Sequence, residues 1–437
     1  MLTRLSLLSF ALAVQSFAQA SPEMTRALER LDKLEKQNQE LMAEIQQLRT
    51  ELQGSAATPP LTERMDVQEA RTAELAQAKV ETSQRMPISL TGMLLFNAFH
   101  NGKNGAIEEP LTARLTPGSA ASGATFRQTV LGLKFNGPDL PGGGKASGSF
   151  YMDFWGGTAS PDNNLLHIRL ATIDLAWKNT TITVGQDKPI MAPREPTSLA
   201  QVGLAPLTGA GNLWNWEPQA RIEQRFHFND TSGVRVQAGV YQTEEVYPGS
   251  APAAFAASLE RWRPAWQGRV LFYKNLEGKR FEIAPGFSFS ESHVAGTSVA
   301  SQVQTLDWLA QPSKYIEITG AAFHGRNAAG LGSLRQSFTV LPSGAVLPVR
   351  VNGGWGQVAL FPGARLSAHF FGGGEWDRGP SLPGTYVSRN LSYAGNLIYK
   401  LAPNVLAALE LSQLRTTYVA PGTRLNNHYD LAIAYLF

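Results

Sequence analysis

The chain of 437 residues contains no cysteine. It therefore has no disulfide framework, no thiolate metal ligand and no cysteine nucleophile. Charged residues make up only 17% of the sequence and the net charge is +3, so composition gives no case for a nucleic-acid partner. Long apolar runs are also missing, since no continuous apolar stretch reaches the roughly 20 residues that a membrane-spanning helix needs. If the mature chain lies in a membrane, it must cross as a closed barrel of strands.

Motifs of common active sites are missing as well. The 7 histidines are scattered, and none belongs to an HExxH pair. The glycine runs at 142–144 and 372–374 are expected at turns or strand ends, and neither opens a helix as a phosphate-binding loop does. We therefore expect no catalytic residues, no metal site, no cofactor and no enzymatic activity.

Residues 1–20 have the pattern of a secretory signal peptide. Arg4 provides the positive charge, residues 5–14 form a short apolar run, and Ala18-Gln19-Ala20 forms a small-residue cleavage site. The mature chain is therefore predicted to start at Ser21 and to be exported.

Residues 21–54 are predicted to form a periplasmic coiled coil that joins copies of the chain. Apolar residues recur at heptad spacing, and a single core asparagine can set the register. The predicted oligomerisation residues are Leu31, Leu34, Asn38, Leu41, Ile45, Leu48 and Leu52. The alternative is a lone amphipathic helix that docks on the rest of the chain. Residues 55–87 are interpreted as a linker or a second short helix.

From residue 88 to residue 437 helical periodicity gives way to short alternating segments, which are typical of β-strands. Sixteen segments are predicted, at 88–99, 125–136, 145–155, 165–177, 181–187, 218–228, 233–242, 267–275, 280–291, 297–310, 313–324, 352–361, 363–373, 390–401, 404–416 and 428–437.

The predicted connections alternate between long and short. The long ones fall at 100–124, 187–217, 243–266, 325–351, 374–389 and 417–427. Barrels of the bacterial outer membrane have this asymmetry, with short periplasmic turns and long outer loops. We therefore predict an all-β fold, a sixteen-stranded antiparallel transmembrane β-barrel with both ends of the chain on the short-turn side.

The last predicted strand supports an outer-membrane location. Tyr429, Leu431, Ile433, Tyr435 and the terminal Phe437 share one face. A final strand that ends on phenylalanine resembles the assembly signal of outer-membrane barrels, so the barrel-assembly machinery is an expected partner. Aromatic residues near other strand ends are expected in the interfacial girdles, namely Trp155, Trp177, Tyr241, Tyr315 and Tyr399.

The mature chain resembles the porins of the group that contains the DcaP-like trimeric porins and the phosphate-selective O/P porins. The segments that carry this resemblance are the heptads at 24–52, FRQTVLGLKF at 126–135, RLATIDLAW and TITVGQDKP within 169–189, PQARIEQRF at 218–226 and the terminal AYLF. The resemblance implies a homotrimer, held by the barrel wall and the coiled coil, that passes small hydrophilic solutes. The sequence departs from phosphate-selective pores because it shows no dense ladder of lysine and arginine.

The resemblance also points to the third outer loop, 187–217, which often folds inward in such porins and forms the constriction. The strand that follows alternates charged with apolar residues, and charges that face a water-filled lumen cost little. We predict as pore-lining residues Lys188, Arg194, Glu195, Arg221, Glu223 and Arg225. In this interpretation Arg194 and Glu195 face Arg221 and Arg225. The alternative is a solvated loop on the rim, in which Arg194 and Glu195 neutralise each other.

Three functions follow from the sequence. The first is a passive porin for small hydrophilic solutes in the outer membrane, with lipid and other copies of the chain as partners. The second is a channel selective for sugars or small organic anions, in which Trp214 and Trp216 contribute to a binding track. The third is a structural envelope tether or adhesin.

Overall fold

A computed structural model of the chain describes residues 88–105, 110–157, 164–243, 263–294, 297–334, 338–379 and 382–437, together with Lys36, Gln37, Glu40, Ala43 and Glu44. Residues 86–437 form one compact unit and residues 1–85 another. The five residues described in the first unit are helical and exposed. The predicted signal peptide, the linker and all seven oligomerisation residues lie outside the described residues. Among the described residues, no helix is long and apolar enough to cross a membrane.

The second unit is built almost entirely from antiparallel strands. In chain order they are β1 (Ile88–Asn101), β2 (Ala121–Thr125), β3 (Val130–Leu140), β4 (Gly144–Gly156), β5 (Leu165–Ala176), β6 (Thr180–Asp187), β7 (Glu217–Asn229), β8 (Ser232–Thr243), β9 (Arg263–Leu276), β10 (Lys279–Val294), β11 (Thr297–Ser313), β12 (Ile316–Arg326), β13 (Thr339–Val340), β14 (Val346–Leu347), β15 (Arg350–Leu360), β16 (Leu366–Arg378), β17 (Val387–Ala402), β18 (Val405–Tyr418) and β19 (Gly422–Leu436). One 3-10 turn, η1 (Ala329–Leu331), precedes the small β13–β14 hairpin.

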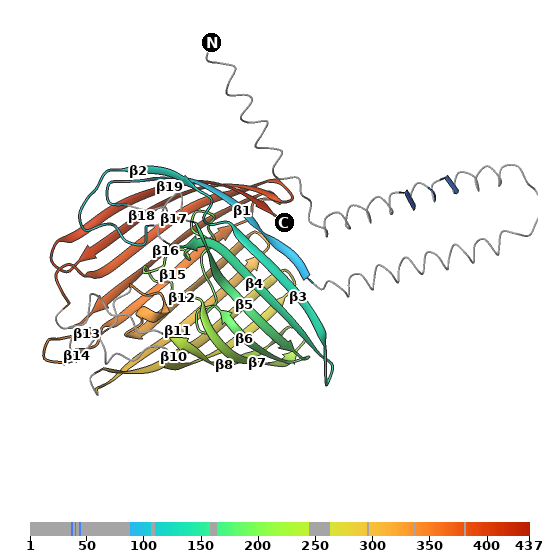
Figure 1. Cartoon of the computed structure of the whole chain (residues 1–437), viewed down its shortest axis with the longest axis horizontal. Coiled ribbons are helices and arrows are strands. Elements are labelled where there is room, and N and C mark those ends of the chain that lie inside the picture. The colour runs from blue at the N-terminus through green and yellow to red at the C-terminus, as the bar shows by residue number, and fades with distance from the viewer. Residues whose placement is uncertain are drawn as a thin grey trace, which may run out of the picture. The chain divides into compact units, whose positions relative to one another are not determined.

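These strands close into a sixteen-stranded barrel (Figure 1). Strands β2 and β3 together count as one strand of the wall, because both pair with the same edge of β1, each along a different part of its length. On its other edge β1 pairs with β19 from Met93↔Leu436 to Asn101↔His428, and this pairing closes the sheet. The predicted fold class and strand number are therefore confirmed for the barrel.

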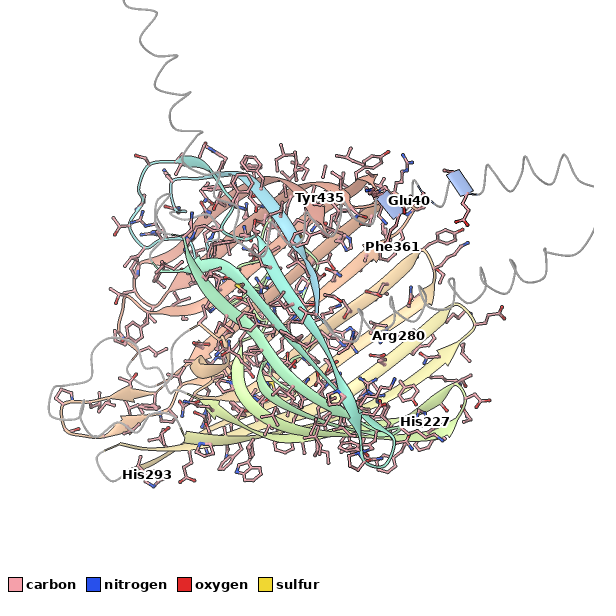
Figure 2. The ribbon with its side chains drawn as sticks, turned by 45° about the vertical axis from the view of Figure 1, so that its right-hand side comes forward. Glu40, His227, Arg280, His293, Phe361 and Tyr435 are labelled. Carbon is pink, nitrogen blue, oxygen red and sulfur yellow. The ribbon has the colours of Figure 1, made fainter. Side chains whose placement is uncertain are left out.

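The connections differ between the two ends of the barrel. Short links lie at one end, at 141–143, 177–179, 230–231, 277–278, 314–315, 361–365 and 403–404. The opposite end carries the long connections 102–120, 188–216, 244–262 and 327–349. Figure 2 shows Phe361, Arg280 and His227 toward the first end and His293 toward the second. The predicted long link 417–427 is wrong, because β18 and β19 continue as a paired hairpin down to a three-residue turn at 419–421.

The outer face of the barrel is apolar and the inner face is polar. In β19 Tyr429, Leu431, Ile433 and Tyr435 are exposed on the outer face, as the alternation predicted, whereas Asp430 and its inward neighbours are buried. The other strands repeat this pattern, so a belt of exposed leucine, isoleucine, phenylalanine and tyrosine surrounds a hydrogen-bonded interior. This inside-out distribution is what a strand barrel in lipid requires.

Two sequence predictions about individual aromatic and glycine residues are corrected. Tyr315 and Tyr399 are exposed, but Tyr241 is buried inside the barrel, where its hydroxyl contacts the Ser288 hydroxyl at 2.6 Å. The ring of Trp155 packs against Gly203 of the connection between β6 and β7 and under the Arg127 guanidinium, so it is also outside the expected girdle. The glycines 372–374 lie in the middle of β16 rather than at a turn, because the backbone of another segment packs against them there.

Candidate functional site

The connection from β6 to β7, residues 188–216, folds into the interior of the barrel. Its two ends are neighbours, since Asp187 pairs directly with Glu217 across β6 and β7. Between them most side chains are buried, including Ile190, Met191 and Leu213, each at most 3% exposed. A loop that left the barrel rim for solvent would not bury its apolar residues in this way. We call residues 188–216 the lumen loop.

Polar side chains of the wall hold the lumen loop along its whole length. Because they point inward from strands on several sides of the barrel, the loop is fixed across the interior rather than along one wall. The side chain of Gln128, between β2 and β3, makes three hydrogen bonds to the loop. It donates to Ala200 O (2.9 Å) and accepts from the amides of Val202 and Gly203. Other wall residues that bind the loop are Asn97, Gln267, Thr305, Gln357, Asn390, Asn396 and Glu410.

Apolar side chains of the lumen loop anchor it at separate places. Met191 and Leu213 pack with residues of β8, β9, β11, β12 and β15, and Leu199 packs with Leu95 and inward alanines of β18 and β19. Leu207 packs against Trp355 and Phe371. Near this third anchor Gly211 has a φ of 101°, and a Cβ there would overlap the carbonyl oxygens of Gly354 and Gly374. A Cβ at Gly373 of β16 would likewise overlap the carbonyl oxygen of Ala210, so glycine on both sides lets the loop backbone approach the wall.

Arg194 ties the first part of the lumen loop to the wall through a buried ion cluster. Its guanidinium binds Asp307 of β11, at 2.6 Å, and Glu282 of β10. Arg269 of β9 binds the same Asp307 carboxylate at 2.7 Å, and Arg280 binds Glu282. Burial alone would lower the pKa of Arg194, but the hydrogen bonds and charges of Asp307 and Glu282 outweigh it and raise the pKa above its ordinary value. Arg194 is therefore a permanent cation in this cluster.

Replacing Arg194 with alanine is expected to destabilise the barrel by about 3 kcal/mol, because it leaves two mostly buried carboxylates short of one cation. Arg269 and Arg280 still neutralise part of that negative charge, so the expected loss of stability is no larger than this. The free energy of unfolding is measured by urea titration, with folded and unfolded barrel separated by their different mobility on a gel. Arg194→Lys keeps the charge but cannot bridge two carboxylates, and should lose about half as much. Equal stability of Arg194→Ala and the parent would contradict this assignment.

The other predicted pore residues lie on the inner face with their own partners. Lys188 binds Glu195 at 2.8 Å, so Glu195 does not pair with Arg194. Arg221 binds Asp187 at 2.6 Å, and Arg225 binds Glu223 at 2.7 Å. Sequence analysis missed Arg235 of β8, which lies directly opposite Arg225 and 3.5 Å from Glu223. The side chains of Arg225 and Arg235 remain 41% and 37% exposed inside the barrel, so water reaches them.

Arg169, which was not among the predicted site residues, lies beside Trp214 and Trp216, which the sequence assigned to a possible binding track. The pairing of β4 with β5 shifts so that Arg169 is an extra residue, and this bulge lets Arg169 and Asp174 both face inward. Arg169 binds Asp153 at 2.9 Å and lies over the Trp216 ring, 4.6 Å from its centroid. Trp214 meets Trp216 edge to face at 4.8 Å. The Arg169 guanidinium of the wall thus packs on the indoles at the end of the lumen loop.

The charged groups of the interior form ion pairs with one another, as Arg221 does with Asp187 and Arg169 with Asp153. Within the described ranges, no group of three or more histidine, aspartate or glutamate side chains could hold a metal ion. The inner charged residues that remain partly exposed include Lys188 and Glu195 of the lumen loop and Arg225 and Arg235 of β7 and β8.

Comparison with known proteins agrees with this architecture. No family model and no curated protein matches the chain. Among solved structures, the outer membrane channel DcaP of Acinetobacter baumannii is similar with a TM-score of 0.66 and 14% identity over 80% of this chain and 97% of that chain. An anion-selective porin from Comamonas acidovorans has a TM-score of 0.54 and 14% identity, with 80% of this chain and 99% of that chain covered. OprB of Pseudomonas putida has a TM-score of 0.51 and 9% identity, with 82% of this chain and 96% of that chain covered.

None of these three structures is described as a phosphate-selective porin. At such low identity the likeness concerns the fold and leaves the solute open. Residues 86–437 of this chain therefore have the fold of the outer-membrane porins, with a DcaP channel among the similar structures.

Proposed function

We propose that the protein is a passive diffusion channel for small hydrophilic solutes across the bacterial outer membrane. The observation that carries this proposal is the set of charged side chains that face the inside of an apolar-walled barrel and remain open to water, such as Arg225 and Arg235. Charges in that position have no use in a solid core, whereas in a channel they act on passing solutes.

Liposome swelling tests this function directly. Vesicles that contain the folded, heat-modifiable protein should swell in isotonic solutions of small sugars, and the rate should fall as the sugar grows toward the pore size. Heat-denatured protein in the same vesicles serves as the control. Vesicles that stay as tight as the control toward every solute would rule out a diffusion channel.

We infer that the narrowest part of the path lies between the first part of the lumen loop and the wall of β7 and β8. The residues that would line it are Lys188, Glu195, Arg221, Glu223, Arg225 and Arg235, while Arg194 holds this part of the loop to Glu282 and Asp307. Basic side chains outnumber acidic ones among the ion-paired groups around this path, which supports a mild preference for anions. The anion-selective porin among the similar structures agrees with that preference.

A second candidate is a channel that binds one class of small organic anion. The indoles of Trp214 and Trp216 beside the Arg169 guanidinium favour it, since an aromatic and cationic pair suits a carboxylate with an apolar body. Saturable block of the ion current by one carboxylate would support this candidate, and loss of that block in Trp216→Ala would locate the binding track.

We further propose that the exported chain assembles as a trimer through the heptads of residues 21–54 and the barrel wall. Deleting residues 24–52 should leave a folded barrel whose oligomer dissociates at a lower detergent concentration or temperature, because the wall contact then acts alone. Crosslinking followed by denaturing electrophoresis measures the trimer fraction. An unchanged trimer fraction would assign oligomerisation to the barrel alone. The terminal Phe437 strand is proposed to engage the barrel-assembly machinery.

A further inference from the structure

Five arginines form a band on the outer wall at the long-loop end of the barrel. They are Arg326 of β12, Arg350 of β15, Arg378 of β16, Arg389 of β17 and Arg415 of β18. All five are exposed. In each strand the arginine shares its face with outward apolar residues, as Arg378 does with Phe370 and Trp376. These side chains therefore point toward the membrane and away from the lumen, and we call them the arginine band.

The register places the cations of the arginine band beside one another. Arg326 pairs directly with Arg350, and Arg350 pairs directly with Arg378. Arg389 lies opposite Trp376, and Arg415 lies opposite Leu391, two residues further along β17. Like charges directly opposite each other in a sheet repel and destabilise it. Three consecutive strands with this arrangement need a counter-charge.

The part of the chain that the structure describes does not supply that counter-charge. In the described residues no carboxylate forms an ion pair with any arginine of the band, and the nearest polar contacts are neutral, such as Arg415 Nε to Gln413 Oε1 at 2.9 Å. The connections above these strands, 327–349, 379–386 and 419–421, contain no aspartate or glutamate in their sequences. The acidic residues of these strands lie on their inward faces, as Glu375, Asp377 and Glu410 do.

The height of the band matches a lipid headgroup layer. On β16 twelve residues separate Leu366, at the short-turn end, from Arg378, and at the usual rise and tilt this corresponds to about 30 Å of membrane thickness. Short-turn ends face the periplasm in such barrels, so the arginine band lies at the outer surface of the hydrocarbon layer. At that depth a guanidinium reaches phosphate, while its stem stays among acyl chains.

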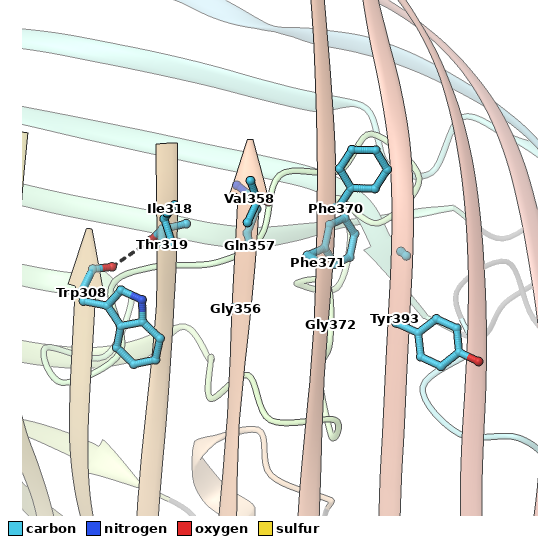
Figure 3. Close-up of a pocket in the computed structure, with 11 residues that line it drawn as sticks. Trp308, Ile318, Thr319, Gly356, Gln357, Val358, Phe370, Phe371, Gly372 and Tyr393 are labelled. Carbon is cyan, nitrogen blue, oxygen red and sulfur yellow. Dashed lines mark hydrogen bonds between the residues drawn. The ribbon is translucent and has the colours of Figure 1, made fainter. Parts of the chain in front are cut away.

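Below the band the same strands form an apolar groove of about 470 Å³ (Figure 3). Gly356 and Gly372 form its floor, and Trp308, Phe370 and Tyr393 stand around it on neighbouring strands. The groove begins about 20 Å along β15 from Arg350, at the rise of a strand. An acyl chain that hangs from a headgroup at the band would therefore lie on this groove.

We propose that the arginine band and the groove beneath it bind a phosphorylated, multiply acylated glycolipid of the outer leaflet. Guanidinium groups hold phosphate by paired, charge-assisted hydrogen bonds, and adjacent arginines can share its oxygens. The phosphate turns the repulsion between Arg326, Arg350 and Arg378 into attraction to a common partner. The site lies outside the lumen, so it does not depend on the proposed channel function.

The test uses the full-length protein in mild detergent, with bound lipid counted by native mass spectrometry. The probes are bisphosphorylated lipid A and the same lipid after removal of its phosphates. The parent should bind the phosphorylated lipid roughly tenfold more tightly than the dephosphorylated one, and the triple variant Arg326→Gln, Arg350→Gln, Arg378→Gln should lose that preference. The matched control removes three exposed cations from the short turns, by Lys178→Gln, Lys314→Gln and Arg365→Gln, and should keep it.

Other outcomes would overturn the proposal. Equal binding of both lipids by the parent, or a triple variant with the parent's preference, would exclude phosphate recognition by the band. Displacement of the lipid by millimolar inorganic phosphate would mean that the band binds free phosphate. If the triple variant loses its trimers but keeps the lipid preference, this face is a contact between copies of the chain. If the triple variant fails to fold, Arg350→Gln alone is used. It should show a smaller loss of the preference for phosphorylated lipid, and an unchanged preference would overturn the proposal. Conductance should be unchanged in all of these variants.

Discussion

Replacing the lumen loop, residues 188–216, with a four-residue glycine-serine link is expected to raise single-channel conductance roughly threefold, because a sixteen-stranded barrel without an inward loop leaves a wide aqueous channel. The link is sterically simple, since Asp187 and Glu217 are already paired neighbours on β6 and β7. The loop fills much of the interior through anchors such as Met191 and Leu199, and its removal returns that volume to water.

A milder variant controls for damage to the barrel. Gln128→Ala removes three hydrogen bonds to the loop and leaves the loop in the chain. It should increase current noise and cause a small rise in mean conductance, without the loss of size exclusion expected of the full replacement. Planar-bilayer recordings of both variants, with gel shifts to confirm folding, make the comparison. A conductance equal to that of the parent in the folded replacement would mean that the lumen loop does not limit the pore.

Neutralising the arginines of the inner wall is expected to have the second large effect. The triple variant Arg221→Gln, Arg225→Gln, Arg235→Gln leaves Asp187 and Glu223 without their cations. The field inside a narrow, low-dielectric passage concentrates ions of the opposite sign, so the ratio of chloride to potassium permeability should fall by roughly an order of magnitude. The reversal potential in a KCl gradient should change sign.

Three cations removed outside the lumen provide the matched control for this variant. Lys178→Gln, Lys314→Gln and Arg365→Gln change the net charge by the same amount, but these residues are exposed in the short turns. Their reversal potential should stay within error of the parent. If the inner-wall variant also keeps the parent's reversal potential, the path of the ions does not pass these arginines.

The strands could be predicted from the sequence because their signal is local. Each crosses the wall with outward apolar and inward polar residues in alternation, and turn residues such as Asn179 and Gly278 separate them. The closed barrel followed from the number of strands and from the alternation of the connections. The hairpin around 419–421 was misjudged because its paired ends extend past the lipid belt and lose the apolar alternation that identifies a strand.

The candidate site could be predicted only in part, since its contacts are distant in sequence. Arg194 binds carboxylates 88 and 113 residues away, and no local pattern links them. Arg169 joins the interior through a one-residue bulge, which the alternation of β5 by itself cannot position. The arginine band depends on register in the same way, because Arg326, Arg350 and Arg378 become neighbours only when β12, β15 and β16 are aligned.

We propose that this barrel is an open, passive channel whose interior is narrowed by the lumen loop. Single-channel recording of the purified full-length protein in a planar bilayer across a KCl gradient tests it most directly. We expect discrete openings, closures in thirds of the full conductance and a reversal potential of the sign that marks a mild preference for anions. Folded, heat-modifiable protein that produces no conductance step would contradict the claim and would mean that the lumen loop closes the barrel.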